Sequence, residues 1–126
     1  MASTLRLRLV SYNGPRLTQR AQAASIAGLN ETMDACVSEG KMNHRGWRNR
    51  TGRAEASIKV LRRASPFGSG SAGGSWGSGP GSALGDAPYF IYLERRYGTL
   101  RGAADVVYPT LGNRVISNFH RLAAGG

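Results

Sequence analysis

Two glycine-rich matches to catalytic or nucleotide-binding motifs lie between residues 68 and 77. Residues 68–73 satisfy G-x-G-x-x-G, in which glycines let a dinucleotide pyrophosphate approach the first turn of a helix. Residues 73–77 satisfy G-x-S-x-G, the turn that exposes a nucleophilic serine in hydrolases. Both motifs require a strand before the glycines and a helix after them, whereas more glycine and serine follow here. We therefore interpret both as chance matches, and a small hydrolase is the least favoured of the functions considered.

Other residue types that perform catalysis or bind metals are few and scattered. His44 and His120 lie far apart, and neither has a partner at metal-ligand spacing; the place of His120 predicts an exposed side chain. Cys36 is the only cysteine, and its apolar helical surroundings favour a small buried side chain. The seven acidic residues form no obvious pair for general acid and base catalysis. The sequence therefore predicts a protein that is not an enzyme and uses no cofactor or metal ion.

The strongest chemical signal is positive charge, most of it carried by arginine. The chain has 126 residues and a formal net charge of +10, from 17 Lys and Arg against 7 Asp and Glu. Guanidinium groups form forked hydrogen bonds to phosphates and carboxylates. The composition therefore predicts a polyanionic neighbour, either a nucleic acid or the acidic surface of a protein partner.

A basic connector at residues 41–53 places Trp47 among four arginines. Interleaved arginine and tryptophan side chains can hold a single-stranded nucleic acid by stacking on its bases. The alternative is that Trp47 packs on the core while the arginines stay in solvent. The sequence alone leaves both interpretations open.

The elements that must position these residues follow from periodicity. The length fits one domain, residues 1–126. Residues 5–9 alternate leucine and arginine, which predicts a short strand with one wet face. A long helix is predicted from Pro15 to about Glu39, closed by Gly40, with a thin alanine-rich stripe that suits close packing. A last helix is predicted to begin at Pro109.

Two further strands are predicted, at residues 57–63 and 89–95, paired antiparallel. The Gly/Ser-rich segment 65–88 between them is expected to form a long hairpin loop, with Phe67 and Trp76 as its two anchors. Ordered glycine-rich chain needs a surface to hold it, so docking of residues 66–86 onto another chain is expected. The predicted fold class is α+β: a small antiparallel sheet packed against a long N-terminal helix and a C-terminal helix.

The predicted hairpin also gathers most of the arginine at one end of the subunit. We call this set the basic pole, and we expect it to meet either a nucleic acid or the acidic surface of a protein partner. The basic pole consists of Arg45, Arg48, Arg50, Arg53, Arg95, Arg96 and Arg101.

These features resemble the small head–tail joining proteins of tailed bacteriophages, also called neck or tail-completion proteins. Members typically show a long N-terminal helix, a Thr-Gly turn followed by Ser-Ile, a tyrosine-rich strand ending in Glu and Gly-Thr, and a proline that opens the last helix. The resemblance covers about half of the chain, between residues 15 and 123. The matching motifs occur here in the same order: Thr51-Gly52, Ser57-Ile58, Tyr89, Tyr92, Glu94, Gly98-Thr99 and Pro109.

The resemblance implies a structural virion protein that is made in the bacterial host cytoplasm and resides in the neck of the phage. It would form a homo-oligomeric ring, six- or twelve-fold, between the portal or head-completion proteins and the tail tube or terminator proteins, with double-stranded DNA passing through its channel. An arginine-lined channel would bind the DNA backbone tightly, so we expect most of the basic pole to face protein partners and a minority to face DNA. The alternative function is a small basic RNA- or DNA-binding protein. Glu94 is expected near Arg53, either in a contact with the next subunit or as an exposed pair of little energetic value. The residues expected at subunit or partner interfaces are Phe67, Trp76, Glu94, Arg95, Arg96 and Tyr97.

The N-terminal residues contain no apolar run long enough for a signal peptide. No segment approaches the roughly 20 apolar residues that span a bilayer. The sequence therefore predicts no contact with a membrane.

Overall fold

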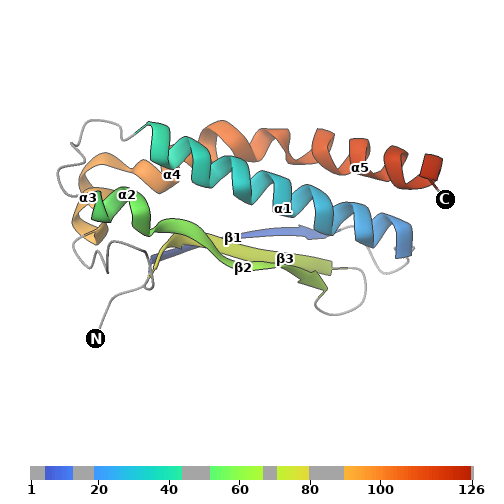
Figure 1. Cartoon of the computed structure of the whole chain (residues 1–126), viewed down its shortest axis with the longest axis horizontal. Helices are drawn as coiled ribbons and strands as arrows, with labels where there is room; N and C mark the ends of the chain where they lie inside the picture. Colours follow the sequence, from blue (N-terminus) through green and yellow to red (C-terminus); the bar gives the residue numbers. More distant parts are fainter. Residues whose placement is uncertain (1–4, 13–18, 44–51, 67–70, 80–89, 126) are drawn as a thin grey trace.

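The computed structural model describes residues 5–12, 19–43, 52–66, 71–79 and 90–125. A helical layer lies over one face of an antiparallel sheet (Figure 1). The elements in chain order are β1 (Leu5–Tyr12), α1 (Gln19–Met42), α2 (Arg53–Ser57), β2 (Ile58–Pro66), β3 (Ser71–Ser78), α3 (Phe90–Tyr97), α4 (Thr99–Val107), the 3₁₀ turn η1 (Tyr108–Thr110) and α5 (Leu111–Gly125). The predicted mixture of a long N-terminal helix, an antiparallel sheet and a C-terminal helix is confirmed.

The sheet has three strands in the order β1-β3-β2, so the last strand of the sequence lies in the middle. Strand β1 confirms the strand predicted from alternating leucine and arginine, and it pairs with β3 from Leu5 opposite Ser78 to Tyr12 opposite Ser71. Strand β2 pairs with the other edge of β3, with Ile58 opposite Ser78 and two register shifts farther along. The central strand is therefore held by ladders on both sides.

The predicted Gly/Ser hairpin loop is wrong over residues 71–78, because these residues form the central strand β3. Glycine and serine have low intrinsic preference for strands, so their strand conformation here comes from packing. At Gly74, a Cβ atom would lie 2.7 Å from Met33 Cε and 2.8 Å from the Arg62 carbonyl oxygen. Only glycine lets β3 lie this close to α1 and β2 at once.

The strand predicted at residues 89–95 is also wrong: residues 90–97 form helix α3, and residue 89 lies outside the described residues. The predicted pairing of 57–63 with 89–95 is replaced by the pairing of β2 with β3. Phe90, Leu93 and Tyr97 recur at helical spacing, with Phe90 buried and the other two packed against the core. The aromatic run therefore carries a helical period as well as an alternating one, and packing selected the helix.

Helix α1 packs on β2 and β3, and α5 packs along α1 (Figure 1). The contact between the two helices is close at Gly28, where a Cβ atom would lie 2.6 Å from Val115 Cγ2 and 3.0 Å from the Val115 nitrogen. Gly40 does not end α1 as predicted but lies buried inside it, facing Ile58. The buried core lies between the helical layer and the sheet, around Leu29, Met33, Cys36, Ile58, Trp76, Phe90 and Leu100.

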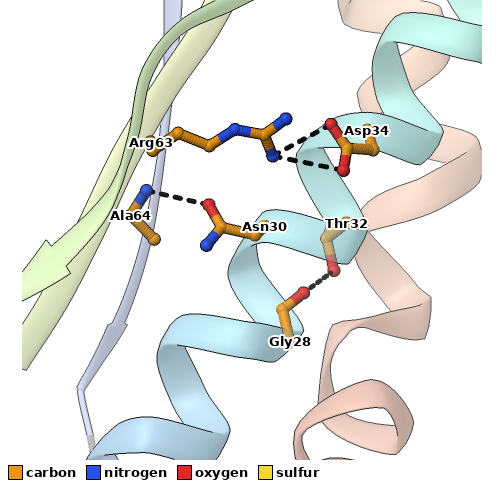
Figure 2. Close-up of polar contacts among 6 residues, drawn as sticks. All are labelled: Gly28, Asn30, Thr32, Asp34, Arg63 and Ala64. Carbon is orange, nitrogen blue, oxygen red and sulfur yellow. Dashed lines mark hydrogen bonds and ion pairs between the residues drawn. The ribbon is translucent and has the colours of Figure 1, made fainter.

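Polar contacts on the helix side of β2 fix its position against α1 (Figure 2). Arg63 forms an ion pair with Asp34, its Nη1 3.0 Å from Oδ1. The Ala64 backbone N–H donates to Asn30 Oδ1 at 2.9 Å. These contacts show that Arg63 points toward the helical layer.

Candidate interaction surfaces

Glu94 joins helices α3 and α4 through a capping interaction. Its carboxylate accepts hydrogen bonds from the backbone N–H of Leu100, at 2.6 Å, and of Arg101, at 3.0 Å. These N–H groups belong to the first turn of α4, where a helix has no internal acceptors and where its dipole favours negative charge. Gly98 supplies the turn with φ 63°, a left-handed conformation that glycine adopts at little cost. Residues 94–99 therefore form a short junction between two consecutive helices, in which Glu94 caps α4 and Gly98 makes the turn.

This geometry gives Glu94 a role inside its own subunit. Its side chain is buried, with 9% of its surface exposed, and both carboxylate oxygens have backbone partners. The predicted contact of Glu94 with an arginine of a neighbouring subunit rested on a strand that ends at this residue. The strand is absent, and the burial of Glu94 offers no support for that contact.

Trp76 is not available as an anchor for a partner, which corrects the sequence-based prediction. It is fully buried at the centre of β3, and its indole Nε1 donates to the Tyr108 hydroxyl at 3.0 Å. A tryptophan among glycines and serines can anchor a loop on a partner or fill a core opposite small residues, and the fold shows the second. The other proposed anchor, Phe67, lies outside the described residues.

Part of the basic pole is exposed on α3 and α4. Arg95 and Arg96 lie exposed in the last turn of α3, and Arg101 is exposed on α4. The Arg96 guanidinium carbon lies 5.6 Å from the centre of the half-buried Tyr97 ring, a cation–π contact. The tight junction between α3 and α4, and not the predicted hairpin, sets the positions of these three arginines.

The rest of the basic pole is described only in part. Arg53 is the first residue of α2, which lies at the same end of the long axis of the molecule as α3 (Figure 1). Arg45, Arg48 and Arg50, like Trp47 between them, lie outside the described residues. The hairpin that led us to place these arginines together is absent. That Arg45, Arg48 and Arg50 lie at the same end of the subunit as Arg95 stays a prediction.

Sequence reasoning missed a basic surface on the sheet. Strand β1 contains two arginines, β2 contains a lysine and two arginines, and none of the three strands contains an acidic residue. Arg6 and Arg8 pair with Gly77 and Ser75 across one ladder, and Lys59 and Arg62 pair with the same two residues across the other. We call the sheet surface away from the helical layer the outer face; it comprises the positions of Arg6, Arg8, Lys59, Arg62, Gly73, Ser75 and Gly77. The signal was visible as the arginines of residues 5–9, but the partner strand was not.

A second missed surface is apolar and lies on the last two helices. Val106 on α4 and Ile116 on α5 are each 56% exposed, and Phe119 and Leu122 are exposed at 38% and 36%. Leu111, Val115, Phe119 and Leu122 fall at steps of four, four and three along the sequence, the spacing of one helix face. Only Leu111 and Val115 are packed inward, and Asn118 takes the next inward position, its Nδ2 donating to Glu31 Oε2 at 2.9 Å. We call the set Val106, Ile116, Phe119 and Leu122 the apolar stripe.

Metal ligands, a reactive thiol and a membrane span are the features that the sequence led us not to expect. No three His, Cys, Asp or Glu side chains in the described ranges lie together in a way that could hold a metal ion. Cys36 is buried as predicted, and burial raises its pKa to about 12 against a weaker opposing effect of Arg114. His120 is exposed, as its position predicted. None of the helices in the described part of the chain is long and apolar enough to cross a membrane.

Comparison with known proteins gives no relative for this chain: no family model, no curated protein and no solved structure matches it.

Proposed function

We propose that this chain is a structural virion protein of a tailed bacteriophage that forms a homo-oligomeric ring in the neck. The ring would connect the portal or head-completion proteins to the tail tube or terminator proteins and surround the DNA channel. No bond is made or broken in this function; its work is a repeated geometry around an axis. The proposal combines the resemblance of the sequence with one surface of the fold.

The observation that carries the proposal is the apolar stripe. Its four side chains lie on α4 and α5, and each exposes more than a third of its surface to solvent in the isolated chain. A soluble protein rarely exposes several large apolar side chains together unless another protein covers them. Ile116, Phe119 and Leu122 recur at three-residue steps on α5, so this part of the stripe suits the neighbouring copy in a ring.

Several motifs of the resemblance fall at defined points of the fold, although the segment expected as a tyrosine-rich strand is helix α3 here. Gly52 is left-handed, with φ 78°, immediately before α2. Ser57 ends α2, and its hydroxyl lies 2.7 Å from the Ser78 hydroxyl of β3. Glu94 and Gly98 shape the α3–α4 junction. The motifs thus lie at points where the chain changes direction, which is where a fold constrains residue type most strongly.

The test of the ring compares two double variants on α5. Ile116→Glu with Phe119→Glu adds two charges to the apolar stripe, whereas Asn113→Glu with Ser117→Glu adds the same charges at exposed polar positions. We expect the first pair to abolish assembly, alone or with portal and tail partners, and the second to leave it intact. Native mass spectrometry measures the assembly, and circular dichroism checks that both variants fold.

A wild-type chain that stays monomeric with every neck partner would refute the ring, as would equal assembly by the two double variants. Electron microscopy of the purified virion would test the location directly. Density for this chain away from the neck would refute the proposed position even if rings form.

A second candidate function is a free, small, basic nucleic-acid-binding protein. The observation that favours it is the outer face, where β1 and β2 place cations and none of the three strands contains an acid. Such a protein would bind nucleic acid as a monomer, and its affinity would fall steeply with salt. Oligomeric mass therefore separates the two functions.

A further inference from the structure

We propose that the outer face of the sheet binds the phosphate backbone of double-stranded DNA, without preference for sequence. This inference goes beyond the ring, because it assigns a ligand to a surface that no part of the assembly argument uses. It stands on the strand register and on the charges of the sheet.

The alternation of side chains along β3 defines the outer face. Trp76 points into the core and Gly74 faces Met33 of α1, so Gly73, Ser75 and Gly77 point the opposite way. On that side Figure 1 shows no described helix. The outer face is therefore the side of the sheet that the rest of the described chain leaves uncovered.

Two rows of cationic positions border the three small residues of β3. Arg6 and Arg8 lie on the β1 side, opposite Gly77 and Ser75. Lys59 and Arg62 lie on the β2 side, opposite the same residues. Neighbouring strands are about 4.8 Å apart and alternate residues about 6.8 Å apart, so the four positions outline a patch of about 10 by 7 Å.

Arg62 and Arg63 are neighbours on β2, but they lie on opposite sides of the sheet. Arg63 turns to α1, where Asp34 neutralises it (Figure 2). Arg62 is exposed and is paired in register with Ser75, on the other side of the sheet. On the helix side an acidic residue thus meets Arg63, whereas the three strands themselves contain no acidic residue.

The floor between the two rows favours a phosphate ligand over an acidic protein surface. Gly73, Ser75 and Gly77 are small and buried, Ser75 with only 7% exposed, so the strand between the two rows offers neither a large side chain nor a reachable hydroxyl. Protein interfaces depend on aromatic and other large anchors in pockets. Phosphate contacts depend mainly on lysine and arginine, which are the residue types of the two rows.

Double-stranded DNA fits better than a single strand. Proteins that hold single strands stack the bases on aromatic side chains. Among outer-face residues whose side chains are described, none is aromatic, and Trp76 is occupied in the core. Because the patch has no group arranged to read base edges, binding is expected to be independent of sequence.

The experiment measures binding of the full chain to a fluorescent 25-base-pair duplex by anisotropy, over a range of NaCl concentrations. The variant Arg8→Glu with Arg62→Glu reverses the two positions beside Ser75. Its control, Arg20→Glu with Lys41→Glu, changes net charge equally on α1, outside both the outer face and the basic pole. We expect the sheet pair to raise the Kd by roughly tenfold or more and the control pair by clearly less.

A neutral pair, Arg8→Ala with Arg62→Ala, covers the case in which charge reversal disturbs the fold. It is expected to reduce the slope of log K against log salt by about 2, one for each lost phosphate contact. Equal losses in the sheet and control pairs would mean diffuse attraction and overturn the inference. Failure of the wild-type chain to bind the duplex at low salt would also overturn it.

Two further outcomes separate this inference from its competitors. If the sheet pair weakens binding to a poly-glutamate probe but not to the duplex, the outer face serves an acidic protein and the inference is wrong. A chain that stays monomeric with every neck partner and binds DNA through Arg8 and Arg62 would refute the ring alone. A ring whose DNA affinity ignores these residues would refute this inference alone.

Discussion

The carboxylate of Glu94 holds the start of α4 at a fixed angle to α3. Two first-turn N–H groups, of Leu100 and Arg101, donate to it, and its burial keeps water from replacing it. We expect Glu94→Ala to lower the free energy of unfolding by about 1 to 2 kcal/mol, the usual cost of losing a cap. Urea denaturation followed by circular dichroism measures the loss.

Two variants bracket this expectation. Glu94→Gln keeps one acceptor oxygen and is expected to fall between wild type and Glu94→Ala. Asp105→Ala removes an exposed carboxylate from the same helix α4 and is expected to stay within about 0.5 kcal/mol of wild type. Loss of assembly by Glu94→Ala without loss of stability would restore the intersubunit contact that the sequence first suggested.

Cys36 links stability to alkaline pH. Burial raises its pKa in the folded chain to about 12, from an ordinary value of 9.0, while Arg114 opposes the shift. Above about pH 9 the unfolded chain therefore loses this proton and the folded chain keeps it, so stability falls with rising pH until about pH 12.

Cys36→Ala removes this thiol and its share of the alkaline loss. At pH 10.5 we expect the wild type to have lost about 1 to 2 kcal/mol more than Cys36→Ala, relative to each protein at pH 8. Denaturation curves at the two pH values give the difference. Parallel losses in both proteins would show that Cys36 ionises as freely when folded as when unfolded.

At the scale of elements, the packing of α5 on α1 depends on a glycine. A Cβ at Gly28 would lie 2.6 Å from Val115 Cγ2 and 3.0 to 3.1 Å from Val115 backbone atoms, so the helices would have to separate. We expect Gly28→Ala to cost about 1 to 3 kcal/mol, as overpacking of a core does. Thermal and urea denaturation measure the cost.

Gly112 provides the matched control on α5. A Cβ there would meet nothing within 4 Å, so Gly112→Ala is expected to leave stability unchanged or raise it by up to about 1 kcal/mol. Adding Val115→Ala to Gly28→Ala should recover only part of the loss, because the Val115 backbone stays close. Full tolerance of Gly28→Ala would mean that the two helices are packed less closely than described.

The elements that could be predicted are those whose own residues carry a clear period. Alternation identified β1, and apolar steps identified α1 and the C-terminal helix. Strand β3 could not be found this way, because its conformation depends on ladders from β1 and β2 and on the space left by Met33. Helix α3 was missed because its aromatic run supports two periods, and the Glu94 cap that favours the helix became visible only in three dimensions.

The candidate surfaces were predictable to a smaller extent. The exposure of Arg95, Arg96 and Arg101 agrees with an interaction role, although the hairpin that was to gather them is absent. The outer face depends on which strands are neighbours, and β1 meets β2 only through β3. The apolar stripe could not be recognised from spacing alone. Phe119 lies one helical step after Val115, which packs against Gly28, yet Phe119 is exposed.

At the scale of the whole molecule, Arg95 and Arg96 test the proposed assembly with neighbouring rings. Both are exposed at the end of α3, away from the core. We expect Arg95→Glu with Arg96→Glu to block the joining of heads to tails, because forked contacts to acidic partners would become repulsive. Each side chain is exposed, so the melting temperature is expected to change little.

In vitro joining of purified heads and tails, scored by electron microscopy, measures this effect. Arg20→Glu with Lys41→Glu on α1 serves as a control with the same change in charge. If the Arg95, Arg96 variant joins normally and only DNA retention or ejection changes, the basic pole lines the channel and does not grip a protein.

The strand order β1-β3-β2 also has a consequence for how the chain is made. Among the described strands β1 is synthesised first on the ribosome, yet the strand that pairs with it is β3, which follows α1, α2 and β2. Until β3 has left the exit tunnel, β1 waits as an unpaired, leucine-rich segment, the kind of strand that can pair with other chains. Nascent protein is therefore most exposed to aggregation before β3 emerges, and chaperone dependence should fall once it has.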